Sequence, residues 1–367
     1  MSLSTDPSRP YAHLGPDTVL DALNAAGLPA DGRLLQLNSY ENRVWQAPLE
    51  DGRVVVVKFY RPGRWTDAQI LEEHAFTAEL AAADLPVLAP LPLQADGHDK
   101  RLRVSHAPAP APDEFEAQAP AAPEPTLGHF NDDISSTSAW RFAVCERRVG
   151  RAAELEEPEV LARMGRLLAC LHGVGGRSRF VHRRTLDSQT FGHAARARLM
   201  DGGFVRPETE DAWISTSAQA LALVDHAFAR HEGLRHIRLH GDCHSGNVLW
   251  RAEGEHAGPN FVDFDDCCMG PAIQDLWMLL PGERSAVEAA LYHLLDGYRD
   301  FREFDDRELL LIEPLRTLRM IHHSAWLAER WSDPAFPQAF PWFASPAYWS
   351  QQTTELREQI ERMQQTT

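Results

Sequence analysis

Residues 240–247 read HGDCHSGN, and residues 261–266 read FVDFDD. The first stretch places a carboxylate, Asp242, five residues before an amide, Asn247, and the second stretch adds the carboxylate of Asp263. Phosphoryl transfer needs such a set. One acidic group orients the acceptor hydroxyl and takes its proton, while an amide oxygen and a carboxylate hold Mg²⁺ against the phosphates. The pattern therefore predicts phosphoryl transfer with ATP and Mg²⁺.

The two stretches resemble the corresponding loop and strand of the aminoglycoside phosphotransferase and choline kinase superfamily, whose fold is protein-kinase-like. In that family, His-Gly-Asp is followed by Asn and then by Asp, and Asp242, Asn247 and Asp263 match this order without a gap. The resemblance implies that Asp242 is the catalytic base. It also implies that Asn247 and Asp263 bind the metal ion and, through it, the nucleotide.

The first half of the chain offers a matching cation and carboxylate. Lys58 lies on a predicted strand, 53–60, and Glu73 lies on a predicted helix, 67–83. The resemblance implies that Lys58 binds the α- and β-phosphates of ATP and that Glu73 holds Lys58 by an ion pair. A buried cation needs such a partner to stay charged. The apolar face of the helix favours Glu73 over the neighbouring glutamates as this partner.

A further candidate lies at residues 38–44, which read NSYENRV. The glycine-rich loop of protein kinases is absent from this position. Small polar side chains and backbone amides can still cover phosphates. We therefore expect Ser39 to contact the nucleotide.

Four tracts make the resemblance more specific, because they match the bacterial stress response kinase A family: residues 39–44, 58–65, 274–279 and 331–337. The resemblance covers most of the chain, apart from residues 106–137 and the termini. Members of that family are described as Ser/Thr protein kinases that act on proteins. The resemblance therefore implies an ATP-dependent kinase that phosphorylates a protein hydroxyl.

The order of predicted elements favours an α+β fold with two lobes. Residues 1–146 are expected to form an ATP-binding lobe, with a five-stranded antiparallel sheet and one helix. Residues 147–367 are expected to form a mainly helical lobe that carries catalysis and substrate binding. Short strands are predicted at 91–93 and 102–104. The Pro/Ala-rich segment at 106–137 cannot bury much apolar surface, so we expect a surface insertion.

Composition excludes several partners. The 367 residues carry a formal net charge of −17, which argues against a nucleic acid or an anionic membrane as partner. No apolar run reaches about 18 residues, so no membrane-spanning helix is expected. The five cysteines form no disulfide framework, and the N-terminus does not resemble a signal peptide. We therefore expect a cytoplasmic protein with reduced thiols, and the family resemblance favours a monomer.

Several roles stay open at this level. The resemblance to kinase-like folds implies that Asp275 accepts hydrogen bonds from the 240–247 loop. His240 is expected to position that loop. Asp265 and Asp266 could contact metal or substrate, or could simply be solvated. Three cysteines lie in or next to residues 240–247 and 261–266: Cys243, Cys267 and Cys268. They could sense oxidants, but we expect them to serve as small apolar side chains near the core.

Two rival functions also stay open. The first is a small-molecule kinase that acts on an aminoglycoside, choline, ethanolamine or sugar-type hydroxyl. A cationic acceptor of this kind could bind to the acidic surplus and to four aromatic residues: Trp326, Trp331, Trp342 and Phe343. The second is an inactive kinase-like scaffold. The intact set of predicted site residues argues against the scaffold.

Overall fold

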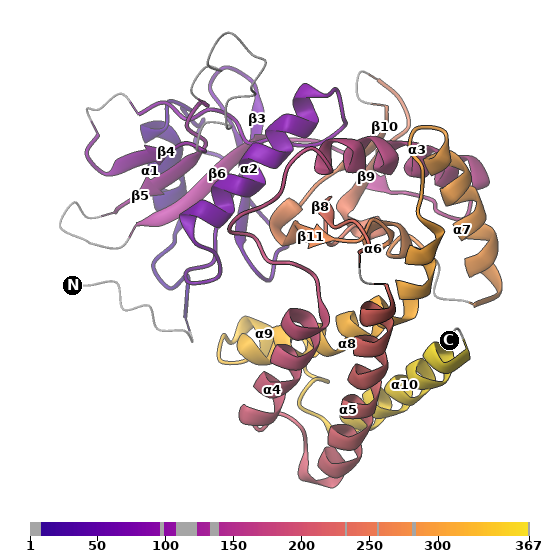
Figure 1. Ribbon diagram of the computed structural model, residues 1–367. Coiled ribbons are helices and arrows are strands. Elements are labelled where there is room, and N and C mark those ends of the chain that lie inside the picture. Colours follow the sequence, from indigo (N-terminus) through magenta and orange to yellow (C-terminus); the bar gives the residue numbers. More distant parts are fainter. Residues whose placement is uncertain are drawn as a thin grey trace. The chain divides into compact units, whose positions relative to one another are not determined.

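The chain divides into two compact units (Figure 1). The first contains Met1–Arg151 and Leu249–Asp265, and the second contains Ala152–Val248 and Asp266–Thr367. The computed structural model describes residues 9–95, 99–107, 123–132, 139–231, 233–254, 257–280 and 284–365.

The first unit is built on a six-stranded antiparallel sheet in the order β1-β2-β3-β6-β5-β4. The β-branched run Val54–Val57 favours an extended strand and forms most of β3. Gly52 has a φ of 87° and closes the turn between β2 and β3, a backbone region that glycine favours. The strands are β1 (Leu35–Leu37), β2 (Arg43–Pro48), β3 (Val54–Phe59), β4 (Leu102–Ser105), β5 (Leu127–Phe130) and β6 (Trp140–Glu146).

Two helices pack on this sheet. Helix α1 (Pro16–Ala25) shares an apolar cluster with Phe142 of β6, and helix α2 (Asp67–Ala82) shares another with Ala143. Neighbouring residues of a strand point to opposite faces, so the two helices cover opposite faces of the sheet. Helix α2 begins with a capping box, in which the Thr66 side chain accepts from the Gln69 N–H. Figure 1 shows it lying across the sheet.

The sheet has six strands where five were expected, and it differs from the predicted one in two places. Strand β5 falls inside the predicted 106–137 insertion, yet all four of its residues are buried and it pairs with both β4 and β6. The predicted strand at 91–93 is irregular instead, although the Leu91 N–H donates to the Val144 carbonyl at 2.6 Å. Most other residues of the predicted insertion, 108–122 and 133–138, lie outside the described residues.

The boundary between the units also differs from the expected one at 146. The first unit runs to Arg151 and includes Leu249–Asp265, which carries most of β9 (Val248–Arg251) and all of β10 (Gly258–Phe261). Strand β10 belongs there because the Phe261 N–H donates to the Pro86 carbonyl at 2.8 Å. Strands β10, β9 and β7 (Arg151–Ala152) form a small sheet in that order.

The second unit is mainly helical, as predicted. Helix α8 packs against α4, α5 and α10, and the indole of Trp213 on α5 donates to Gln352 of α10 at 2.6 Å. Strands β8 (Ile237–Leu239) and β11 (Cys268–Gly270) pair antiparallel. The helices are α3 (Pro158–Gly175), α4 (Ala194–Asp201), α5 (Pro207–Arg230), α6 (Ile273–Trp277), α7 (Arg284–Arg299), α8 (Ile312–Glu329), α9 (Ala335–Ala339) and α10 (Pro346–Gln365).

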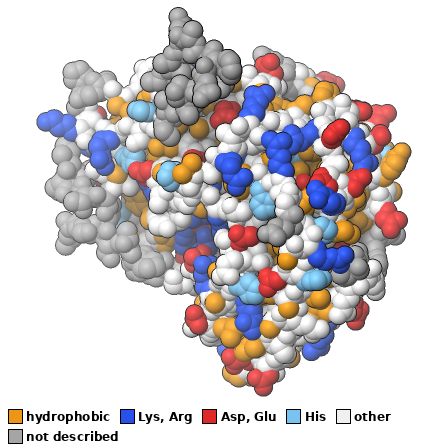
Figure 2. Space-filling view, in the orientation of Figure 1, with side chains coloured by type: hydrophobic (Ala, Val, Ile, Leu, Met, Phe, Trp, Pro, Cys, Tyr) orange, Lys and Arg blue, Asp and Glu red, His pale blue; other side chains and the backbone are white. Residues whose placement is uncertain are grey.

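The surface mixes charges of both signs. On the face drawn in Figure 2, acidic and basic side chains of the described residues lie interspersed. All five cysteines are free thiols. In the part of the chain that the structure describes, no helix has both the length and the apolar character required to cross a membrane.

Candidate active site

The 240–247 loop follows strand β8, and a buried carboxylate accepts hydrogen bonds from its backbone. Asp275, on helix α6, accepts hydrogen bonds from the backbone N–H groups of His240, at 2.9 Å, and Gly241, at 2.8 Å. The same side chain lies 3.1 Å from Nε2 of His172, and all of these contacts are buried. The predicted supporting role of Asp275 is therefore confirmed.

Gly241 is the turning point of this loop. Its φ of 85° lies in the left-handed region, and an added Cβ atom would collide with the backbone carbonyl of Asp266. A residue with a side chain would therefore strain the loop and push it away from the backbone at Asp266. The motif needs glycine here so that the next residue, Asp242, can take its position.

Asn247 is tied to Asp242 within the loop. Its side-chain Nδ2 donates to the backbone carbonyl of Asp242 at 2.9 Å, and its backbone N–H donates to the carbonyl of His244 at 2.9 Å. Because the amide nitrogen makes this bond, the amide oxygen is the atom left to bind a ligand. An oxygen donor is what Mg²⁺ prefers, so Asn247 fits the predicted metal role.

The Asp242 carboxylate lies between two cationic or polar side chains. Arg319 Nη1 lies 2.5 Å from Asp242 Oδ1, and His244 Nε2 lies 3.5 Å from Oδ2. Burial raises the pKa of Asp242, but the hydrogen bond from His244 and the charge of Arg319 outweigh it and lower the pKa to about 2. The carboxylate is thus ionised at neutral pH, and its side chain is 25% exposed.

His240 and His244 have different positions around the loop. His240 is fully buried, and its Nδ1 accepts a hydrogen bond from the Asp242 backbone N–H at 3.4 Å. This agrees with the predicted positioning role. His244 is half-exposed, and its Nδ1 accepts from the Gly246 N–H, so its Nε2 carries the proton that faces Asp242.

The first unit brings Lys58 and Glu73 together, as the sequence predicts. Lys58 lies on β3 between Val44 of β2 and Ala143 of β6. Its Nζ is 3.1 Å from Glu73 Oε1 on helix α2, and the Glu73 side chain is only 6% exposed. The ion pair is therefore confirmed, while the nucleotide-binding role of both residues stays a prediction.

Asp265 joins this pair. Its Oδ1 lies 2.6 Å from Lys58 Nζ, and its Oδ2 accepts from Asn42 at 2.5 Å and from Arg64 at 3.0 Å. Burial raises the pKa of Asp265, but the charges of Lys58 and Arg64 outweigh it and lower the pKa to about 2. The solvated alternative is therefore wrong for Asp265.

Asp263 lies in the same unit, two residues after strand β10. Its φ of 61° is unusual for a residue other than glycine, and such strain is common where a side chain must take a set direction. Burial lowers the pKa of Lys58, but Asp265, Glu73 and Asp263 together raise it well above the usual value. Asp263 thus acts electrostatically on Lys58, and its carboxylate suits Mg²⁺.

Ser39 and Asp266 occupy separate places. The Ser39 hydroxyl accepts a hydrogen bond from the Asn42 N–H at 3.3 Å and shapes the 38–42 loop of the first unit. Asp266 belongs to the second unit, where its Oδ1 accepts from Arg184 at 3.0 Å. The two carboxylates that the sequence left undecided, Asp265 and Asp266, therefore have different partners.

The cysteines in and next to residues 240–247 and 261–266 behave as small apolar side chains of the core. Cys243, Cys267 and Cys268 are fully buried or nearly so. Burial raises the pKa of Cys243 and Cys268 well above the usual value, which disfavours the reactive thiolate.

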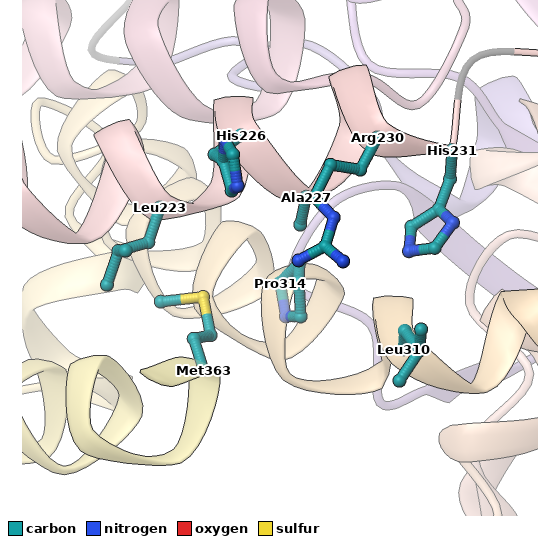
Figure 3. Close-up of a pocket in the computed structure, with 8 residues that line it drawn as sticks. All are labelled: Leu223, His226, Ala227, Arg230, His231, Leu310, Pro314 and Met363. Carbon is teal, nitrogen blue, oxygen red and sulfur yellow. The ribbon is translucent and has the colours of Figure 1, made fainter. Parts of the chain in front are cut away.

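A pocket in the second unit has no part in this chemistry. Figure 3 shows its eight lining side chains, which come from α5, α8, α10 and the turn before α8. None of the predicted site residues is among the eight. They are Leu223, His226, Ala227, Arg230, His231, Leu310, Pro314 and Met363.

The described site has two features that the sequence did not indicate. Arg319 and Arg64 each bind a carboxylate of the predicted site from a distant point in the chain, 77 and 201 residues away. Neither arginine belongs to the loop motif. Arg319 could have been suggested by its spacing from Arg316 and His323, because the three residues lie on one face of α8.

Solved structures show the same fold. The amicoumacin kinase hAmiN, in complex with AMP-PNP, Ca2+ and Ami, has a TM-score of 0.64, with 20% identity over 96% of this chain and 94% of that chain. A microcompartment-associated aminopropanol kinase has a TM-score of 0.67, with 17% identity over 95% of this chain and 98% of that chain. At these identities the likeness concerns the fold alone.

Sequence relatives are much closer. Stress response kinase A of Escherichia coli strain K12 is 38% identical over 355 residues, which cover 97% of this chain and 95% of the relative. The serine/threonine protein kinase RdoA of Salmonella typhimurium strain LT2 is 37% identical over 95% of this chain and 93% of its own length. Residues 33–312 also match the phosphotransferase enzyme family. The chain therefore belongs to the phosphotransferase enzyme family and, within it, to the stress response kinase A family.

Proposed function

We propose that this kinase transfers the γ-phosphate of ATP to a serine or threonine hydroxyl of a protein, with Asp242 as the base. The observation that carries the proposal is the Asp242 carboxylate, which is ionised, partly exposed and fixed within the 240–247 loop. The protein acceptor is supported by the relative named serine/threonine protein kinase RdoA.

The chemistry requires little beyond positioning and charge neutralisation. When bound, Mg²⁺-ATP supplies the phosphoryl group. Asp242 accepts the proton of the acceptor hydroxyl as its oxygen bonds to the γ-phosphorus, and the bond from that phosphorus to the β,γ-bridging oxygen breaks. When a metal ion is bound, Asn247 and Asp263 would each offer it an oxygen ligand, and Lys58, kept in place by Glu73, would bind the α- and β-phosphates.

The 38–42 loop completes the proposed nucleotide site. Ser39 lies in this loop and is the residue that we expect at the phosphates. Its hydroxyl already accepts from the Asn42 N–H, so it can donate its own proton to a phosphate oxygen.

Two features disfavour a small cationic acceptor. The guanidinium of Arg330 lies over the ring of Trp326, 5.2 Å from the ring centroid. The ring of His323 stacks on the Trp326 ring, with 5.7 Å between the centroids. These groups of the chain take the place that a ligand cation would need. Arg319 lies against Asp242 and would repel an ammonium group close to the acceptor hydroxyl.

The remaining aromatic residues also serve packing. Phe343 is fully buried, and Trp331 packs against it with 5.0 Å between the ring centroids. Trp342 is 42% exposed, but its ring contacts Tyr348 at 4.9 Å. The four aromatic residues that could have formed a cation site are therefore mostly part of a hydrophobic cluster.

Radiolabelled ATP tests the proposal. The full chain is incubated with Mg²⁺, labelled ATP and a generic basic protein, beside an Asp242→Ala variant. Asp300→Asn is the matched control, because Asp300 is an exposed, ion-paired aspartate of the same unit. We expect label on protein with the natural chain and the control but not with Asp242→Ala. A parallel incubation supplies choline or an aminoglycoside in place of the basic protein. Label on these small molecules, with none on protein, would overturn the protein acceptor.

A further inference from the structure

Lys58 and Arg64 share one carboxylate in the first unit. Lys58 Nζ lies 2.6 Å from Oδ1 of Asp265, and Arg64 Nη1 lies 3.0 Å from Oδ2. The side chains of Lys58, Arg64 and Asp265 are 20%, 8% and 5% exposed. Two cations on the two oxygens of one carboxylate must lie close to each other, so Arg64 belongs to the same electrostatic site as Lys58.

Arg64 is held in that position by its surroundings. Its guanidinium packs over the ring of Trp65 at 5.0 Å from the centroid, and its Nε lies 3.8 Å from Oε1 of Glu41. The turn that carries it follows strand β3, with the Arg64 N–H donating to the Arg61 carbonyl at 3.3 Å. A guanidinium fixed in this way loses little conformational entropy when it binds a ligand.

The loop beside Arg64 differs from the phosphate-binding loop of protein kinases. Residues 38–42 contain no glycine, so they do not form the flexible glycine-rich cover that protein kinases place over phosphates. Asn42 ties this loop to Asp265, because its Nδ2 donates to Oδ2 at 2.5 Å and its Oδ1 accepts from the Arg61 N–H at 3.2 Å. The donors that point at Asp265 thus come from side chains.

A nucleoside triphosphate needs more positive charge than Lys58 supplies. Glu73 already neutralises part of the charge of Lys58. Arginine offers a planar set of donors that matches phosphate oxygens in pairs. We propose that Arg64 is a second phosphate-binding residue, which contacts the polyphosphate of the nucleotide beside Lys58. This inference rests on the proposed function, in which Lys58 binds the α- and β-phosphates.

The test compares nucleotides that differ in their number of phosphates. Calorimetric titration of the full chain with Mg²⁺ measures the affinity for AMP-PNP, a triphosphate analogue, and for adenosine. The variants are Arg64→Gln and Arg64→Lys. Arg53→Gln is the matched control, because Arg53 is an exposed arginine of the same unit that pairs with Asp51 in a turn.

We expect Arg64→Gln to weaken AMP-PNP binding by about tenfold or more, because a charged hydrogen bond is lost. Adenosine affinity should stay unchanged, and Arg64→Lys should lose less triphosphate affinity because it keeps the charge. If Arg64→Gln does not fold, which its thermal unfolding curve would show, Arg64→Lys decides by the same comparison of the two ligands.

Two results would overturn the inference. One is AMP-PNP affinity within about twofold of the natural chain in both variants. The other is an equal loss of affinity for AMP-PNP and adenosine, which would mean that Arg64 only supports the fold. Failure of the natural chain to bind AMP-PNP at all would instead remove the proposed function on which the inference rests.

Discussion

Arg319 of helix α8 donates a hydrogen bond to Asp242 of the 240–247 loop, with 2.5 Å between Arg319 Nη1 and Asp242 Oδ1. The two residues are 77 positions apart in the chain. The contact gives the proposed base a fixed orientation and a nearby positive charge. It also means that an acceptor hydroxyl must approach a carboxylate that already has a partner.

Replacing Arg319 should change the pH dependence of the reaction. In the natural chain the pKa of Asp242 is about 2, so the base stays ionised. Protonation of Asp242 should therefore not reduce activity between pH 8 and pH 5. Arg319→Gln removes a charge that lowers this pKa, so the acid limb of kcat/KM should move to higher pH. Rate profiles of both proteins from pH 4 to pH 8 check this. The activity of Arg319→Gln should fall toward pH 4 relative to that of the natural chain, and superimposable profiles would contradict the expectation.

Replacing Asp265 should destabilise the first unit. Asp265→Asn removes the carboxylate charge that the buried cations Lys58 and Arg64 share. Breaking a buried ion pair by removing one partner costs about 3–5 kcal/mol, so we expect a loss of that order in the free energy of unfolding. Urea denaturation followed by tryptophan fluorescence measures it.

The matched control for this measurement is Asp51→Asn. Asp51 pairs with Arg53 on the surface of the same unit, where solvent screens the pair. We expect this variant to unfold at the same urea concentration as the natural chain. Equal midpoints for Asp265→Asn and Asp51→Asn would show that the buried pairing contributes nothing.

Glu308 should make stability depend on pH. It is buried, and its Oε2 accepts from the Ile273 N–H at the start of helix α6. Burial raises the pKa of Glu308 from 4.5 to about 7, against the opposing effect of that hydrogen bond. The folded chain thus binds this proton more tightly than the unfolded chain does, so the contribution to stability is full below about pH 4.5 and is lost as pH rises through 7.

Comparison with Glu308→Gln isolates this effect, because glutamine keeps an acceptor and has no proton to lose. The natural chain should lose about 3 kcal/mol relative to the variant between pH 4.5 and pH 7.5. Thermal unfolding at a series of pH values provides the comparison. A constant difference between the two proteins over that range would rule out the raised pKa.

The parts of the site that lie close together in sequence, or on one regular element, could be predicted. The order of Asp242, Asn247 and Asp263 is a local motif. The family resemblance implied the pairing of Lys58 with a glutamate, and the apolar face of helix α2 favoured Glu73. Asp275 could be predicted because an aspartate at this place supports the loop in kinase-like folds, which the chain resembles. In each case a short stretch of sequence, together with the family resemblance, carries the signal.

The parts that were missed depend on contacts between distant segments. Arg64 and Asp265 are 201 residues apart, and neither residue type is unusual in its own stretch. Strand β5 was missed because it is short, follows a Pro/Ala-rich segment and contains His129, which is buried 3.5 Å from Asp67. Its assignment needs the hydrogen bonds of β4 and β6 on either side.

The central claim is that Asp242 is the base of a phosphoryl transfer, and Asp242→Asn tests it most directly. The variant keeps the shape of the side chain and removes its charge. One preparation of each protein is assayed both for AMP-PNP affinity and for transfer of labelled phosphate to protein. We expect AMP-PNP affinity to stay within about twofold of the natural value, while transfer falls by about a hundredfold or more. Transfer at the natural rate by Asp242→Asn would contradict the assignment.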